Sequence, residues 1–183
     1  MKNIYLQIVL LFTISLFMSH SSKAQEFNDL DKSPHDIAYY RVNKITPPII
    51  KVLYGRPQKN GREIFGSLLP YGEVWRVGAN EATEIRFYQD VIFGKEKVKA
   101  GTYVLYAIPG ETEWTLILNS NIDTWGAKDY KENFDVARAK AKVSKAEFLE
   151  VFSIGFKNKG KHVNMVLAWD TIRITAPIKF EKQ

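Results

Sequence analysis

Residues 70–83 read PYGEVWRVGANEAT and place two aromatic residues, one arginine, two acids, one amide and two glycines in a single turn–strand–turn unit. Glycine permits tight or left-handed backbone at both turns. Trp75 is large enough to anchor a core. Arg76, Asn80 and Glu81 can follow it inside only if they are paired. The stretch therefore predicts a bend that joins two sheets, with a polar network that is either internal or open to a ligand.

The segments on both sides of this bend alternate apolar and polar residues with the period of β-strands. Strands are expected at 37–42, 49–54, 83–88, 91–93, near 98, and at 102–108, 114–118, 137–143, 152–156, 163–169 and 172–178. Residues 137–143 alternate alanine or valine with arginine or lysine, which predicts an edge strand with a cationic outer face. Residues 146–150 suggest a helical turn. About ten short strands predict an all-β fold, either a single antiparallel β-sandwich or a jelly-roll-like flattened barrel.

The chain has 183 residues, of which 45% are hydrophobic, so it is long enough for one domain with a substantial core. Its formal net charge is +6. Residues 1–24 contain two lysines and no acid, so the remaining chain has 24 basic and 20 acidic side chains, a net charge of +4. This excess is spread along the sequence without a dense basic block, so nucleic acid is not an expected partner.

Residues 1–24 have the pattern of a secretory signal peptide, with Lys2 before an apolar run and small residues at 22 and 24. The alternative is an uncleaved membrane anchor, but the run at 4–18 is shorter than the ~20 residues that a spanning helix needs. We therefore expect a flexible leader at 25–36, a single β-sandwich domain at 37–183, no membrane span after cleavage, and a periplasmic or secreted location. The sequence has no cysteine, which excludes lipidation on cysteine, disulfides and thiolate metal sites.

A series of short motifs carries a resemblance to a known family. They are YGRP at 54–57, GREIFG at 61–66, the stretch at 70–83, AGTY at 100–103, IPG at 108–110, EW at 113–114 and WG at 125–126. In this order they resemble the domain of unknown function 2911 family, over residues 49–177. The resemblance implies an exported, single-domain envelope protein of a Gram-negative bacterium and implies no particular activity. The family often has threonine where this chain has Val77, which removes a hydroxyl beside the expected site.

Three arginines stand at loop or strand ends beside glycine, proline or tryptophan, where a guanidinium can fork onto a carboxylate or stack on an indole. They favour a pocket for an anionic or polyhydroxylated ligand; the alternative is an internal network, for example Arg76 with Glu81. Trp125 lies in the longest loop and either stacks on a sugar or plugs the end of the sandwich. Trp114 and Trp169 are expected in the core. The candidate ligand-binding residues are Arg56, Arg62, Tyr71, Trp75, Arg76, Asn80, Glu81 and Trp125.

No catalytic, metal or cofactor motif accompanies these residues. Only His35 and His162 follow the expected cleavage site, far apart in sequence. Asn119, Asn121 and Asp123 have calcium-loop spacing, but threonine and tyrosine replace the glycine and glutamate of such loops. We expect a non-catalytic binding module for a carbohydrate or a small polar or anionic ligand, without a cofactor. The alternatives are a glycosidase-like hydrolase that uses Glu81 or Asp123 as base, or an envelope scaffold or assembly protein.

Overall fold

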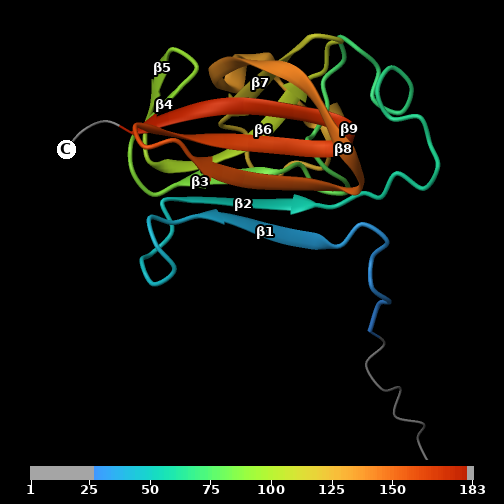
Figure 1. The fold of residues 1–183 in the computed structure, drawn as a ribbon, viewed down its shortest axis with the longest axis horizontal. Coiled ribbons are helices and arrows are strands. Elements are labelled where there is room, and N and C mark those ends of the chain that lie inside the picture. The colour runs from blue at the N-terminus through green and yellow to red at the C-terminus, as the bar shows by residue number, and fades with distance from the viewer. Residues whose placement is uncertain (1–26, 181–183) are drawn as a thin grey trace, which may run out of the picture. The chain divides into compact units, whose positions relative to one another are not determined.

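The computed structural model describes residues 27–180, so the expected signal peptide lies outside the described residues. The residues from Asp31 onward form one compact unit, and the fold is described for this unit alone. Its elements are β1 (His35–Tyr40), β2 (Ile50–Gly55), β3 (Glu84–Phe87), β4 (Val91–Phe93), β5 (Glu96–Val98), β6 (Gly101–Ile108), β7 (Glu113–Asn119), the 3₁₀ turns η1 (Ala127–Asp129) and η2 (Glu132–Phe134), β8 (Asp135–Asn158) and β9 (His162–Phe180) (Figure 1).

The nine strands form one antiparallel sheet in the order β1-β2-β3-β6-β7-β8-β9-β4-β5. The all-β, antiparallel prediction is therefore confirmed. The strand order has two ends, β1 and β5, so the sheet is open and its layers face each other as in a sandwich. At one end of the molecule Gln58, just after β2, forms an antiparallel bridge with Val151 of β8 and joins the two layers.

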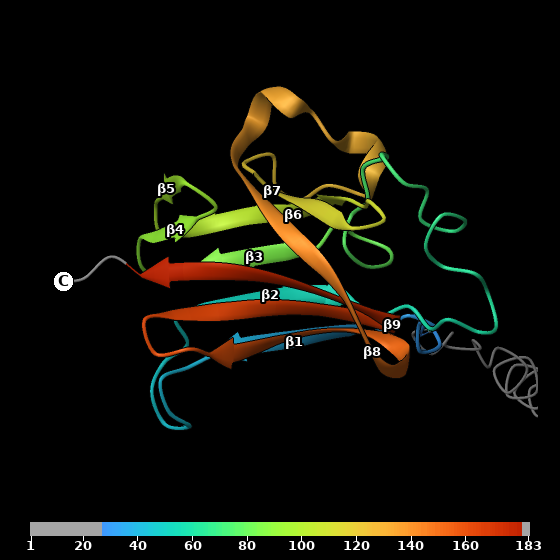
Figure 2. The ribbon, with the colours of Figure 1, turned by 45° about the horizontal axis from the view of Figure 1, so that its top comes forward.

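Strand β8 makes the turn from one layer to the other. Its first part pairs with β7, and its last part, from Ser153, pairs with the beginning of β9. The β8–β9 register shifts twice, between Lys145 and Leu149 and between Leu149 and Ser153. Such bulges bend a strand and increase its twist, and Figure 2 shows β8 running diagonally from the β7 side toward β9.

This bend corrects one expectation from the sequence. Residues 146–150 are extended strand and not a helical turn, and they connect the strands expected at 137–143 and 152–156 into one strand of 24 residues. The alternation expected at 137–143 is confirmed, since Ala137, Ala139 and Ala141 are buried and the basic residues between them are exposed.

The core lies between the layers and is centred on Trp75. The Trp75 ring packs against Trp114 of β7 at 5.9 Å between centroids, against Phe152 of β8 at 5.1 Å and against Trp169 of β9 at 6.2 Å. Its backbone N–H donates to the carbonyl of Ala107 in β6 at 2.7 Å, and its carbonyl accepts the Ala107 N–H at 2.9 Å. The expected core positions of Trp114 and Trp169 are confirmed.

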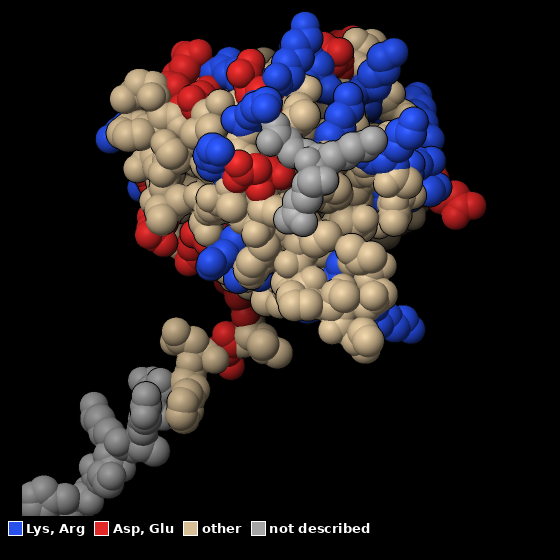
Figure 3. All heavy atoms as spheres, turned by 90° about the vertical axis from the view of Figure 1, so that its left-hand side faces the viewer, with Lys and Arg blue, Asp and Glu red and all other residues tan. Residues whose placement is uncertain are grey.

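The surface charge is mixed. On the face in Figure 3 the lysine and arginine side chains gather toward the upper right, with acidic side chains among and beside them. Several surface cations of the described chain pair with acids, including Lys99 with Asp90 at 2.8 Å and Lys140 with Glu113 at 3.4 Å. Exposed pairs of this kind contribute little to stability.

The packing of Trp75 yields a direct test. We expect Trp75→Ala to lower the free energy of unfolding by about 3–5 kcal/mol, because it opens a cavity between the two layers. Trp125→Ala is the matched control, since that indole is 55% exposed and its loss should change stability by no more than about 0.5 kcal/mol. Urea unfolding followed by circular dichroism measures both. Equal losses in the two variants would contradict the central position of Trp75.

Candidate functional site

The loop between β2 and β3 carries all the residues predicted to form the site apart from Trp125, and close backbone contacts hold it against β2. A Cβ added at Gly55 would lie 2.2 Å from the carbonyl oxygen of Ala79, and one added at Gly78 would lie 2.9 Å from the carbonyl oxygen of Gly55. Any side chain at either position would push the loop away. The two glycines therefore permit the contact that places Arg76 and Asn80.

The same loop has an unusual backbone. Val77 has φ 58° and Asn80 has φ 62°, in the left-handed region. Asparagine tolerates this region, whereas a β-branched residue such as valine is strained there. The Thr83 hydroxyl donates to the carbonyl of Val77 at 2.7 Å, and the Thr83 N–H donates to the carbonyl of Arg76 at 3.1 Å. Thr83 was not among the predicted site residues, because in sequence it resembles any strand residue.

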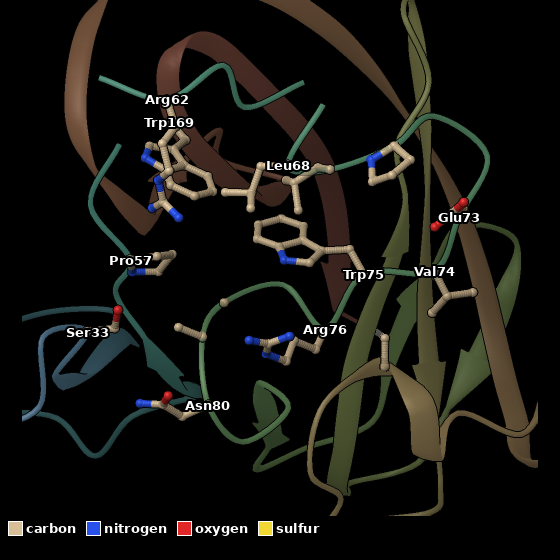
Figure 4. A pocket seen from close by; sticks show the side chains of 15 residues that line it. Ser33, Pro57, Arg62, Leu68, Glu73, Val74, Trp75, Arg76, Asn80 and Trp169 are labelled. Atoms are coloured by element: carbon tan, nitrogen blue, oxygen red, sulfur yellow. The ribbon is translucent and has the colours of Figure 1, made fainter. Parts of the chain in front are cut away.

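Four of the predicted residues, Arg62, Trp75, Arg76 and Asn80, line one cavity of about 450 Å³. We call it the Arg76 pocket. In Figure 4 the guanidinium groups of Arg62 and Arg76 point into the hollow, Asn80 lies on the same side as Ser33, and Glu73 lies at the opposite rim. Trp75 and Leu68 form part of its apolar wall. The volume lies within the range of small-molecule sites.

Arg76 has no acidic partner within residues 27–180. Its Nε is buried and has no hydrogen-bond partner there. The alternative in which Arg76 pairs with Glu81 is wrong, because Glu81 binds His35, with 3.1 Å between Oε2 and Nε2. Burial lowers the pKa of Arg76, since desolvation disfavours the charged form and no carboxylate offsets it. A cation is thus left uncompensated beside a cavity.

Arg62 adds a second cation to this pocket. Its Nε donates to the carbonyl of Lys59 at 2.9 Å and its Nη2 donates to the carbonyl of Gln58, so neutral acceptors fix its position. An acid also lies nearby, because the Asp31 carboxylate accepts the Ser33 N–H at 2.6 Å. That bond and the Asn80 amide lower the pKa of Asp31. Asp31 is thus satisfied by neutral donors.

The remaining arginine and tyrosine of the prediction lie elsewhere. Arg56 donates to the Phe152 carbonyl at 3.2 Å, to Ser153 Oγ at 2.8 Å and to Asp36 Oδ2 at 2.8 Å. It therefore links β1 to β8 in the internal network that was the alternative for these arginines. Tyr71 is exposed and lies close to Gly66. Neither residue lines the Arg76 pocket.

The other two predicted residues, Glu81 and Trp125, line a second cavity of about 590 Å³, which we call the Trp125 cleft. Its other lining residues are His35, Leu53, Ala82, Glu84, Asp123 and Thr124. The Trp125 N–H donates to Asp129 Oδ2 at 3.1 Å, and the Thr124 hydroxyl bonds to the Tyr106 hydroxyl at 2.8 Å. His35 in this cleft was not foreseen, since nothing in its sequence neighbourhood indicates a site.

The described residues show no group of three histidine or acidic side chains that could hold a metal ion. The segment with calcium-loop spacing is a hydrogen-bonded turn instead. Asn119 is fully buried, and its amide donates to Asp135 Oδ1 at 2.8 Å and to the Lys131 carbonyl at 2.9 Å. Within the same part of the chain no helix is long and apolar enough to cross a membrane.

Comparison with known proteins places the chain in a family. The description "Protein of unknown function (DUF2911)" applies to residues 33–178, which include both cavities and all strands apart from the last two residues of β9. The chain belongs to the DUF2911 family. Searches of curated proteins and of solved structures found no match. The family confirms the resemblance of the motif series, and it gives the two cavities no assigned ligand.

The segment before β8 that carries Trp125 is tied down by Tyr130. The Tyr130 hydroxyl donates to Asp135 Oδ2 at 2.8 Å and accepts from Arg138 Nη2 at 2.8 Å. Burial, together with the Asp135 carboxylate, raises the pKa of Tyr130 to about 12. Folding therefore stabilises the neutral phenol of Tyr130 relative to its phenolate form.

This shift predicts a loss of stability at alkaline pH. A tyrosine titrates near pH 10 when unfolded, so the contribution of Tyr130 is fully present below pH ~10 and disappears as the pH rises to about 12. In Tyr130→Phe the free energy of unfolding should therefore fall by about 1–2 kcal/mol less than in the parent over this pH range, after allowance for solvent screening. Urea unfolding at pH 9, 10, 11 and 12 measures it. A decline as steep as that of the parent would contradict the assignment. Other tyrosines with raised pKa values will keep part of the slope.

Proposed function

We propose that the protein binds a small ligand that carries an oxyanion, a carboxylate or a phosphate, in the Arg76 pocket, and that it acts without turnover. One observation carries this proposal: the guanidinium of Arg76 borders a cavity of about 450 Å³ without an acidic partner in the described chain. Leaving a cation partly desolvated and unpaired is unfavourable. A bound oxyanion would supply the missing negative charge beside the guanidinium.

The other lining groups suit the same ligand. Arg62 contributes a second fork of donors whose position is already fixed, which reduces the entropy lost on binding. The Asn80 amide and the Ser33 hydroxyl can donate to ligand oxygens, and the Trp75 side can cover an apolar part. Glu81 and Asp123, which the hydrolase alternative would use as base, line the other cavity, and the Arg76 pocket has one acid among its lining residues, Glu73. The residues that line the Arg76 pocket therefore favour binding of a ligand over its chemical conversion.

The test uses Arg76→Met, with calorimetric titration of phosphate, pyrophosphate, citrate and succinate. We expect the parent protein to bind at least one of these anions saturably and the variant to bind it at least about tenfold more weakly, since a charge-assisted pair is lost. Without ligand, the variant should be more stable by about 1 kcal/mol, because a partly buried cation with an unsatisfied Nε is removed.

Arg86→Met is the matched control, because Arg86 is an exposed arginine on β3 outside both cavities. Its affinity for anions should match that of the parent. The proposal fails if none of the four anions binds, or if Arg76→Met merely destabilises the ligand-free protein. Arg76→Lys keeps the charge without the planar fork and should give an intermediate affinity.

We further propose that the protein is located outside the cytoplasm after residues 1–24 have been removed. Its support is the basic start, the apolar run and the small residues before the cleavage point. We expect the mature protein, purified from the periplasm or medium of an expressing bacterium, to begin at Gln25. Amino-terminal sequencing checks this. A product that retains Met1 in the cytoplasm would contradict it.

A further inference from the structure

The Trp125 cleft is a second cavity, which the proposed function does not use. It is larger than the Arg76 pocket, at about 590 Å³, and it contains no lysine or arginine. Its most prominent feature is Trp125, whose indole is 55% exposed although it lies on a segment held by several hydrogen bonds. A large aromatic surface that is left open to solvent on a backbone held by hydrogen bonds is a platform for a ligand.

The chemistry of the lining separates the possible ligands. Glu81, Glu84 and Asp123 are acids, so an anionic ligand is repelled. A compact cation needs acids that converge on one point, and within the described chain no three histidine or acidic side chains do so. The acids instead line a cavity that is also lined by the apolar side chains of Leu53 and Ala82. Distributed acceptors around an aromatic platform match a ring that carries hydroxyl groups along its edge.

We propose that the Trp125 cleft binds a neutral sugar in the pyranose form. One face of such a ring presents C–H groups, which pack on an indole, while its hydroxyl groups donate to carboxylates. Glu84 and Asp123 have no ion-pair partner among residues 27–180, so both are available as acceptors. Glu81 is oriented by its contact with His35 at 3.1 Å, which fixes a third acceptor at the edge of the cleft.

The backbone supports a preformed cleft. Asp123 has φ 57°, a left-handed conformation that turns its segment, and Gly126 has φ 76° just after the platform residue. The Thr124 hydroxyl is held by the hydroxyl of the buried Tyr106 at 2.8 Å, and the Trp125 backbone N–H donates to Asp129 Oδ2 at 3.1 Å. Hydrogen bonds therefore hold both Thr124 and the backbone of Trp125 in place. A sugar would lose less entropy on such a platform than on a mobile loop.

The experiment titrates cellotetraose, maltotetraose and chitotetraose into the full mature protein, with tryptophan fluorescence and calorimetry as readouts. We expect saturable binding of at least one, with a change in indole emission, and a loss of affinity of at least about tenfold in Trp125→Ala. Trp125→Tyr, which keeps an aromatic face, should retain part of the affinity. Because the Trp125 side chain is exposed, both variants should fold as the parent does.

Phe148→Ala is the matched control, since Phe148 is a 56% exposed aromatic side chain that lies outside both cavities. It should bind sugars as the parent does. Each proposal has its own ligand class and its own variant, anions with Arg76→Met and neutral sugars with Trp125→Ala, so failure of the anion proposal and failure of this one are distinguishable. The proposal is overturned if none of the three sugars binds, if binding survives Trp125→Ala, or if choline binds more tightly than every sugar, which would indicate a cation site.

Discussion

Trp75 is constrained twice, and the position of both cavities depends on it. Its backbone exchanges two hydrogen bonds with Ala107, which fixes it beside β6. Its ring packs against Trp114, Phe152 and Trp169, which come from the sheet segments on either side of the core. The chain therefore continues from a fixed point, and Val77 is still fully buried. The Arg76 carbonyl also accepts a hydrogen bond from the Thr83 N–H, and Glu81 is held by His35.

The residues after the anchor adopt a conformation that is locally unfavourable. Val77 has positive φ, and the Nε of Arg76 is buried without a partner in the described chain. Both features cost stability, and they persist because Trp75 on one side and Thr83 on the other hold the segment. A fold under no other demand would replace them by a glycine and a neutral side chain. Backbone strain and an uncompensated charge in adjacent residues are typical of a binding site.

The sequence was informative wherever a structure depends on near neighbours. Alternation predicted the strands, and Asn60-Gly61, a dipeptide typical of tight turns, has positive φ at both residues, 48° and 69°. The sequence did not predict features that depend on contacts between segments far apart in the chain. The bulges that bend β8 depend on its register with β9, so residues 146–150 resembled an isolated turn.

The same limit explains the candidate site. Arg76 and Glu81 are five residues apart and of opposite charge, so a local pair was plausible. The structure instead brings His35 from β1 to Glu81. Arg56 and Arg62 looked alike in sequence, yet one reaches β8 and the other lines the pocket. Which arginine meets which acceptor depends on strand positions that periodicity does not encode.

The two cavities lie on either side of one stretch of chain, with Asn80 lining the first and its neighbour Glu81 the second. The left-handed turn at Asn80 separates them, and the contact between Gly55 and Ala79 prevents this wall from shifting. The Trp125 cleft is lined by three acids and by no lysine or arginine, whereas the Arg76 pocket is lined by two arginines with Glu73 at its rim. An oxyanion bound beside Arg76, as we propose, would be repelled at the Trp125 cleft, and a neutral ring would gain little beside an uncompensated guanidinium. This difference in charge would favour a different ligand in each cavity.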